Sequence, residues 1–113
     1  ERERIRRELD ERVAERQRQA MNDAWRRVRE VVSNIELRLS ADKTIVRESL
    51  IENASELARL LPGLNVTQDP AMSMVCRDIT DHLLVDVATL RRSRVERKRV
   101  AEKARQILER VPA

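Results

Sequence analysis

The sequence predicts an all-α protein, organised as a four-helix bundle with an extended first helix, and three features support this prediction. The 113 residues include one Trp and neither Phe nor Tyr, so the core must consist of aliphatic and Met side chains, which suit helix-on-helix packing better than a sheet. One Gly and three Pro leave few points where the chain can turn. Residues 1–40 contain neither Gly nor Pro. A chain of this length supports one domain with one core.

The first helix is expected to span residues 1–40, and its apolar stripe changes width along the way. Near its start the stripe is one residue wide and consists of Ile5, Leu9 and Val13. From Ala20 onward the stripe is twice as wide. At ~1.5 Å per residue the helix would be roughly 60 Å long, about twice the length of any other helix expected here. We therefore predict a charged helical arm over residues 1–19, a possible coiled-coil or assembly segment, and a helical bundle domain over residues 20–113.

Charged residues dominate the arm, because 13 of its 19 residues are acidic or basic. Glu3 with Arg7, and Glu8 with Arg12, have the i, i+4 spacing and order that stabilise an exposed helix. The three aliphatic residues are too few to be buried alone, so Ile5, Leu9 and Val13 are the candidate partner interface. The chain starts without Met and without a helix cap, so we expect it to be part of a longer protein.

The second and third helices are expected over residues 43–61 and 70–87. Asp42 or Thr44 can cap the first of these, and Pro62 with Gly63 should end it. Asp69 before Pro70 is typical of a helix start, with Asp as N-cap and Pro as the first helical residue.

The fourth helix is expected over residues 94–111, because Ser93 and Glu96 fit a capping box, in which each side chain bonds the backbone amide of the other residue. Trp25 lies in the wide part of the apolar stripe and is expected to be the largest core residue. Asn65 begins a glycosylation sequon, but we expect its side chain to bond its own loop.

Two features could carry chemistry, and each has a simpler structural interpretation. Asp78, His82 and Asp86 are spaced to share one helix face, but a lone His with carboxylates is a poor zinc site, so we favour a solvated polar surface. Cys76 is the only cysteine and lies on an apolar row, which predicts a small core residue and a reducing, cytoplasmic location. We expect no metal and no cofactor.

A basic segment surrounds the start of the last helix. Residues 91–113 carry nine basic and three acidic groups, and the candidates for phosphate binding are Arg91, Arg92, Arg94, Arg97, Lys98 and Arg99. Cations near a helix N-terminus oppose the helix dipole, so their placement requires some offsetting interaction. A solvated surface or an acidic protein partner would serve as well as nucleic acid. No aromatic residue interleaves with these cations, which argues against base stacking.

The segment LLPGLNVTQDP, residues 60–70, resembles a signature of an uncharacterised helical family of bacteria, phages and mobile elements. The similarity extends over residues 20–111 through Trp25, the step Leu90-Arg91, and the closing residues Ala104, Ile107 and Leu108. That family is encoded near MoxR-type AAA+ ATPases and von Willebrand A-type proteins. The resemblance implies an AAA+ ATPase as a candidate partner, and it implies no activity.

Together these patterns predict a function in binding. The sequence has no Gly-rich phosphate loop, no Ser/His/Asp set and no paired Cys, so we expect no enzyme. It has no apolar run near the ~20 residues that cross a membrane. We expect a cytoplasmic protein–protein interaction or assembly module, partnered by another protein or by itself. The alternatives are a nucleic-acid-binding accessory that uses residues 91–99, and a phage inhibitor of a host protein, which sequence cannot separate from the first hypothesis.

Overall fold

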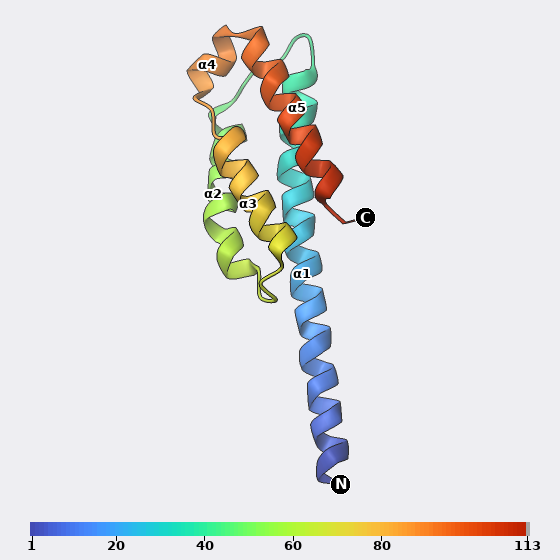
Figure 1. Ribbon diagram of the computed structural model, residues 1–113. Helices are drawn as coiled ribbons and strands as arrows, with labels where there is room; N and C mark the ends of the chain where they lie inside the picture. Colours follow the sequence, from blue (N-terminus) through green and yellow to red (C-terminus); the bar gives the residue numbers. More distant parts are fainter. Residues whose placement is uncertain (113) are drawn as a thin grey trace.

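The computed structural model describes residues 1–112, and this part of the chain is helical and contains no strand. Its helices are α1 (Arg2–Ser40), α2 (Glu48–Leu64), α3 (Pro70–His82), α4 (Val87–Arg92) and α5 (Arg94–Arg110) (Figure 1). The all-α prediction is confirmed. The expected number of four helices is wrong, because the described residues form a short additional helix, α4. No helix within residues 1–112 has the length and apolar character needed to cross a membrane.

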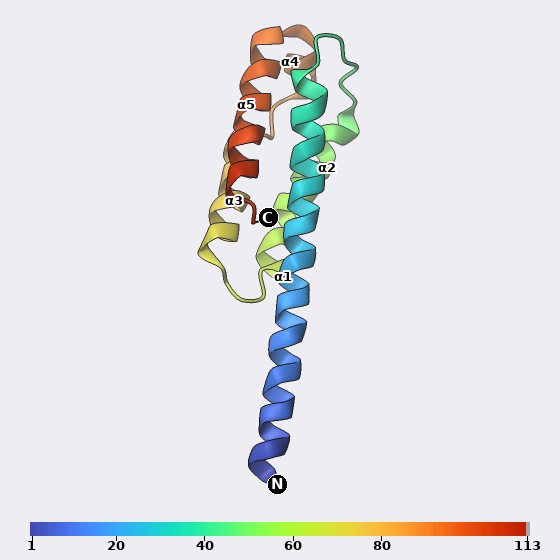
Figure 2. The same ribbon diagram turned by 90° about the vertical axis from the view of Figure 1, so that its right-hand side faces the viewer.

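Helix α1 runs along the whole molecule, and its N-terminal half extends beyond the other helices (Figures 1 and 2). The molecule measures 67 × 22 × 20 Å. Helix α1 packs against α5 and α2, and α3 packs against the same two helices. The core is formed by residues of all five helices and by Val46 and Leu83 in the connections. Helix α4 packs against α5 at the end where α1 finishes.

The core is aliphatic, as the composition predicts. Trp25 is 6% exposed, so its expected place in the core is confirmed. The largest completely buried side chains are Ile35, Leu39, Leu61, Met72, Ile79, Leu83, Leu90, Val28, Val32, Val75 and Val100. They come from all five helices, and the first buried residue of α1 is Met21.

The connection from α1 to α2 is longer than expected, because α2 begins at Glu48 rather than at residue 43. Residues 44–47 are not helical, which lets Val46 enter the core, where it is 3% exposed. Asp42 does not cap α2, since its carboxylate pairs with Arg94 at 3.3 Å. The N-cap is Arg47, which makes no side-chain capping bond.

The predicted end of α2 is also corrected, because the helix continues through Pro62 to Leu64. Proline has no amide hydrogen, so it cannot donate to the carbonyl four residues earlier. That carbonyl belongs to Ala58, and it accepts a hydrogen bond from Cys76 Sγ at 3.3 Å. A side chain of α3 thus supplies the donor that Pro62 lacks.

Asn65 holds the loop between α2 and α3, as predicted. Its Oδ1 accepts from the Asp69 amide at 2.8 Å, and its Nδ2 donates to the Asp69 carbonyl at 3.0 Å. Asp69 in turn caps α3, since its Oδ1 accepts from the Ala71 amide at 2.9 Å. Asn65 is 8% exposed. The LLPGLNVTQDP segment therefore comprises the end of α2, the turn, and the first residue of α3.

Helix α3 ends at His82, five residues before the predicted end at residue 87. The chain then turns, and α4 crosses the end of the bundle so that Leu90 covers the core with 0% exposure. Ser93 caps α5 as predicted, since its Oγ accepts from the Glu96 amide at 3.1 Å. The second half of the capping box is wrong. The Ser93 amide already donates to Thr89 at 2.9 Å, and the Glu96 side chain binds Arg99 instead.

Candidate functional site: the arm, the basic segment and a groove

The predicted interface residues of the arm are all accessible. Ile5 is 54% exposed, Leu9 53% and Val13 55%. Farther along α1, Val32 and Ile35 are completely buried. The arm therefore presents an apolar stripe that contacts nothing else in residues 1–112.

Arginine side chains flank this stripe. At about 100° per residue, Arg2, Arg6, Arg12 and Arg16 project within about 60° of Leu9, whereas the nearest carboxylate, Glu1, is about 80° away. We call these four residues the stripe arginines. None of them forms an ion pair within residues 1–112; the arm's one ion pair there joins Arg18 to Glu15. The expected pairs Glu3–Arg7 and Glu8–Arg12 are not formed, because these exposed side chains extend into solvent.

Three of the six cations in the basic segment contact backbone oxygens. Arg91 Nε donates to the Val46 carbonyl at 2.9 Å, Arg97 Nη1 donates to the Leu90 carbonyl at 2.8 Å, and Lys98 Nζ donates to the Ser40 carbonyl at 2.8 Å. These oxygens lie in the connection to α2 and near the C-terminal ends of α4 and α1.

The remaining cations of the segment make no hydrogen bond to a backbone oxygen within residues 1–112. Arg94 pairs with Asp42 at 3.3 Å, and Arg99 pairs with Glu96 at 2.9 Å, a contact that lowers the pKa of the Glu96 carboxyl. Arg92 makes no such contact within residues 1–112. A helix C-terminus carries partial negative charge. The ends of α1 and α4 therefore supply the interaction that offsets the dipole cost at the start of α5.

The Asp78, His82 and Asp86 set does not share one helix, because α3 ends at His82 and Asp86 precedes α4. Asp78 forms an ion pair with Arg110 of α5. Residues 1–112 contain no group of three His, Cys, Asp or Glu side chains arranged to hold a metal ion.

Cys76 is partly buried against the core, close to its predicted role. Its thiol donates to the Ala58 carbonyl, and burial raises its pKa above the ordinary value of 9.0. The thiol is therefore held in its protonated, weakly nucleophilic form at neutral pH.

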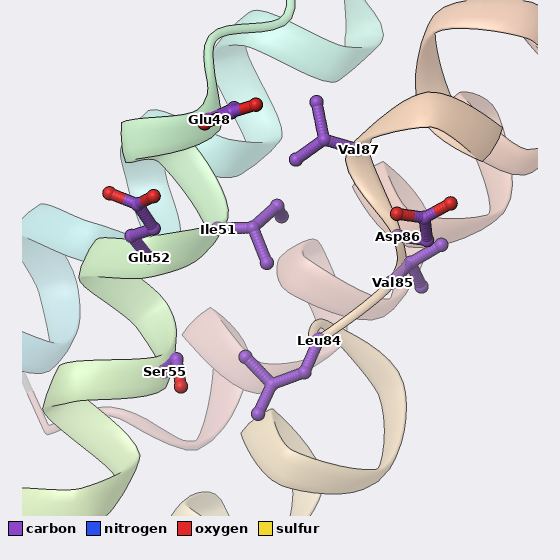
Figure 3. Close-up of a pocket in the computed structure, with 8 residues that line it drawn as sticks. All are labelled: Glu48, Ile51, Glu52, Ser55, Leu84, Val85, Asp86 and Val87. Atoms are coloured by element: carbon purple, nitrogen blue, oxygen red, sulfur yellow. The ribbon is translucent and has the colours of Figure 1, made fainter.

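A groove that sequence reasoning missed lies between α2 and the chain from Leu84 to Val87 (Figure 3). Its volume is about 520 Å³. Ile51, Leu84 and Val87 point toward one another across it, and the Glu48 carboxylate lies near its mouth. The complete lining is Glu48, Ile51, Glu52, Ser55, Leu84, Val85, Asp86 and Val87. We call it the acid-rimmed groove, because it has three carboxylates and no cation.

No sequence signal could have located this groove. The residues from Leu84 to Val87 were expected within one continuous helix, where they would have faced different directions. These residues line a groove with α2 because α3 ends at His82 and the chain leaves the helix there.

No protein-family model matches the chain, and neither a curated protein nor a solved structure matches it. The resemblance carried by residues 60–70 therefore stays a prediction. What the fold defines is an all-helical protein with a projecting helix and an exposed apolar stripe.

Proposed function

We propose that this protein is a non-enzymatic helical interaction module, in which the arm, residues 1–19, is the binding element. Residues 20–113 would be the supporting domain, with α1, α2, α3 and α5 as a four-helix bundle and α4 as a connector. Residue 113 lies outside the described residues. The occupant of the arm would be a second copy of the chain or another protein, and an intracellular location with a reduced Cys76 belongs to the same proposal.

The exposed apolar stripe is the observation that supports this proposal. The three aliphatic side chains lie along one line of the helix, and each is more than half exposed. Burying them against a partner would lower the free energy, because it would remove their apolar surface from water. A partner that covers the stripe would also contact the charged side chains beside it. Charges at the rim of an interface orient the partner and raise the association rate. An AAA+ ATPase as the partner, or a phage protein that inhibits a host factor, would use the same surface.

The proposal is tested by replacing Ile5, Leu9 and Val13 together with Gln, which keeps the helix but removes the apolar stripe. Light scattering should show a lower molar mass than the wild type, or an affinity capture should lose a protein that the wild type retains. The matched control is Leu37→Gln, which changes a 71% exposed aliphatic residue of the same helix. If the triple variant and the control both match the wild type in mass and capture, the arm is not the binding element.

Nucleic-acid binding through residues 91–99 is the alternative function, and its support is the local positive charge. The contacts described above favour the protein-binding proposal. Arg91, Arg97 and Lys98 already donate hydrogen bonds to backbone oxygens, which leaves fewer donors for phosphate. A phosphate-binding role would fall mainly on Arg92, Arg94 and Arg99. Fluorescence anisotropy with duplex DNA at low salt, where phosphate contacts are strongest, tests it.

A further inference from the structure

The exposed face of the arm carries positive charge as well as an apolar stripe. Of the stripe arginines, Arg6 and Arg12 lie on the two sides of the stripe, and Arg2 and Arg16 lie in line with it at its two ends. None of the four has a carboxylate partner within residues 1–112. The arm's acidic residues lie on its flanks and far side. A surface that covers the stripe must therefore be apolar at its centre and acidic at its edges.

Pairing of the arm with another arm does not satisfy this requirement. In an antiparallel pair centred on Leu9, Arg6 would lie opposite Arg12 of the second copy, and Arg2 opposite Arg16. In a parallel pair each stripe arginine would meet its own counterpart. Like charges placed opposite one another oppose association.

The acid-rimmed groove has the required chemistry. Ile51, Leu84 and Val87 form its apolar centre, Glu48 lies near its mouth, and the carboxylates of Glu52 and Asp86 lie on its outer flanks (Figure 3). It lies at the end of the bundle where α1 finishes, whereas the arm projects from the opposite end (Figure 1). A chain cannot place its own arm in its own groove, so a second copy must supply it.

We infer that the arm of one chain docks into the acid-rimmed groove of a second copy, with the stripe aliphatics in the groove and the stripe arginines against its carboxylates. This inference rests on the proposed function and names the arm's partner. Two chains lying antiparallel place each arm beside the other chain's groove. The two contacts are then identical and close a symmetric dimer.

Charge reversal tests the contact from both sides. The arm variant Arg6→Glu/Arg12→Glu and the groove variant Glu52→Arg/Asp86→Arg should each weaken self-association about tenfold or more, because each creates like charges across the contact. An equal mixture of the two variants should associate again. In the mixed pair an acidic arm meets a basic groove, and a wild-type arm meets a wild-type groove. Light scattering and sedimentation measure all of these states.

The matched control is Arg4→Glu/Arg7→Glu, which makes the same charge change on the opposite face of the arm and should leave association unchanged. Circular dichroism confirms that every variant retains its helix content. Loss of association in the arm variant but not in the groove variant would overturn this inference and leave the arm as the binding element. A monomeric wild-type chain would overturn the inference while the capture experiment still decides the proposed function. A wild-type dimer unaffected by both reversals would overturn the inference, and the triple Gln variant would then decide whether the arm is the binding element.

Discussion

Arg91 and Arg92 are adjacent arginines in α4, and the structure assigns them different roles that one pair of substitutions can separate. Arg91 donates to the Val46 carbonyl at 2.9 Å, whereas Arg92 makes no hydrogen bond or ion pair within residues 1–112. Replacing each with Met keeps the length of the side chain and a similar helix propensity, and removes the guanidinium. The two variants therefore differ mainly in the bond to Val46.

The magnitude follows from the environment of that bond. Val46 is 3% exposed, so its carbonyl has little water available when the donor is lost. A hydrogen bond from a charged donor contributes about 1.5–3 kcal/mol, and the exposed guanidinium places this one toward the lower end, so Arg91→Met should cost about 1–2 kcal/mol. The melting temperature should fall by about 5–10 °C. Arg92→Met should stay within about 0.5 kcal/mol of the wild type.

Urea denaturation followed by circular dichroism measures both values. Equal stabilities for the two variants would refute the role given to Arg91 in holding the α1–α2 connection. The same proteins test the nucleic-acid alternative. If residues 91–99 bind phosphate, Arg92→Met should lower DNA affinity and reduce the salt slope by about one. A role in folding alone leaves that affinity unchanged.

Three further predictions concern the core and the turn between α2 and α3. Cys76→Ala should cost about 1 kcal/mol of stability, because it removes the thiol that donates to the α2 carbonyl, and Cys76→Ser should cost less. Because burial raises the pKa of the thiol, wild-type stability should fall as pH rises past 9.0, the ordinary pKa of the thiol in the unfolded chain. Urea midpoints should show this fall in the wild type and not in the Ala variant. Asn65→Ala should cost about 1–3 kcal/mol because the Asp69 amide loses its acceptor and the Asp69 carbonyl loses one of its donors, whereas Asn53→Ala, an exposed control on α2, should be nearly neutral; equal urea midpoints would contradict this. Trp25→Ala should cost about 3–5 kcal/mol, measured by thermal melting, and a loss below about 1 kcal/mol would show that its site is not part of a close-packed core.

The sequence predicted local structure well at the turn between α2 and α3, where residues close in the chain supply both halves of an interaction. Asp69 and Pro70 start α3 as expected, since a carboxylate and the amide it caps are two residues apart. Asn65 bonds its own loop for the same reason. The boundary between arm and core near Ala20 was visible because burial follows the width of the apolar stripe, and Met21 is the first buried residue of α1.

Sequence reasoning failed where the partner of a group is distant in the chain. Pro62 was expected to end α2, but Cys76 of α3 replaces the missing donor and the helix continues. Asp42 or Thr44 was expected to cap α2, but α2 begins at Glu48, and the Asp42 carboxylate pairs with Arg94 of α5. The half-formed capping box at Ser93 is a local failure, because the Ser93 amide already donates to the Thr89 carbonyl four residues earlier.

The sequence by itself determined that this chain is helical, that its core is aliphatic, and that part of its first helix carries a stripe too narrow to bury alone. These are properties of composition and spacing, which repeat along a helix whatever surrounds it. Only the tertiary structure decided what the cations of residues 91–99 contact, and only it formed the acid-rimmed groove. Both depend on carbonyls and side chains from segments far apart in the chain, whose positions are set by packing and not by local preference.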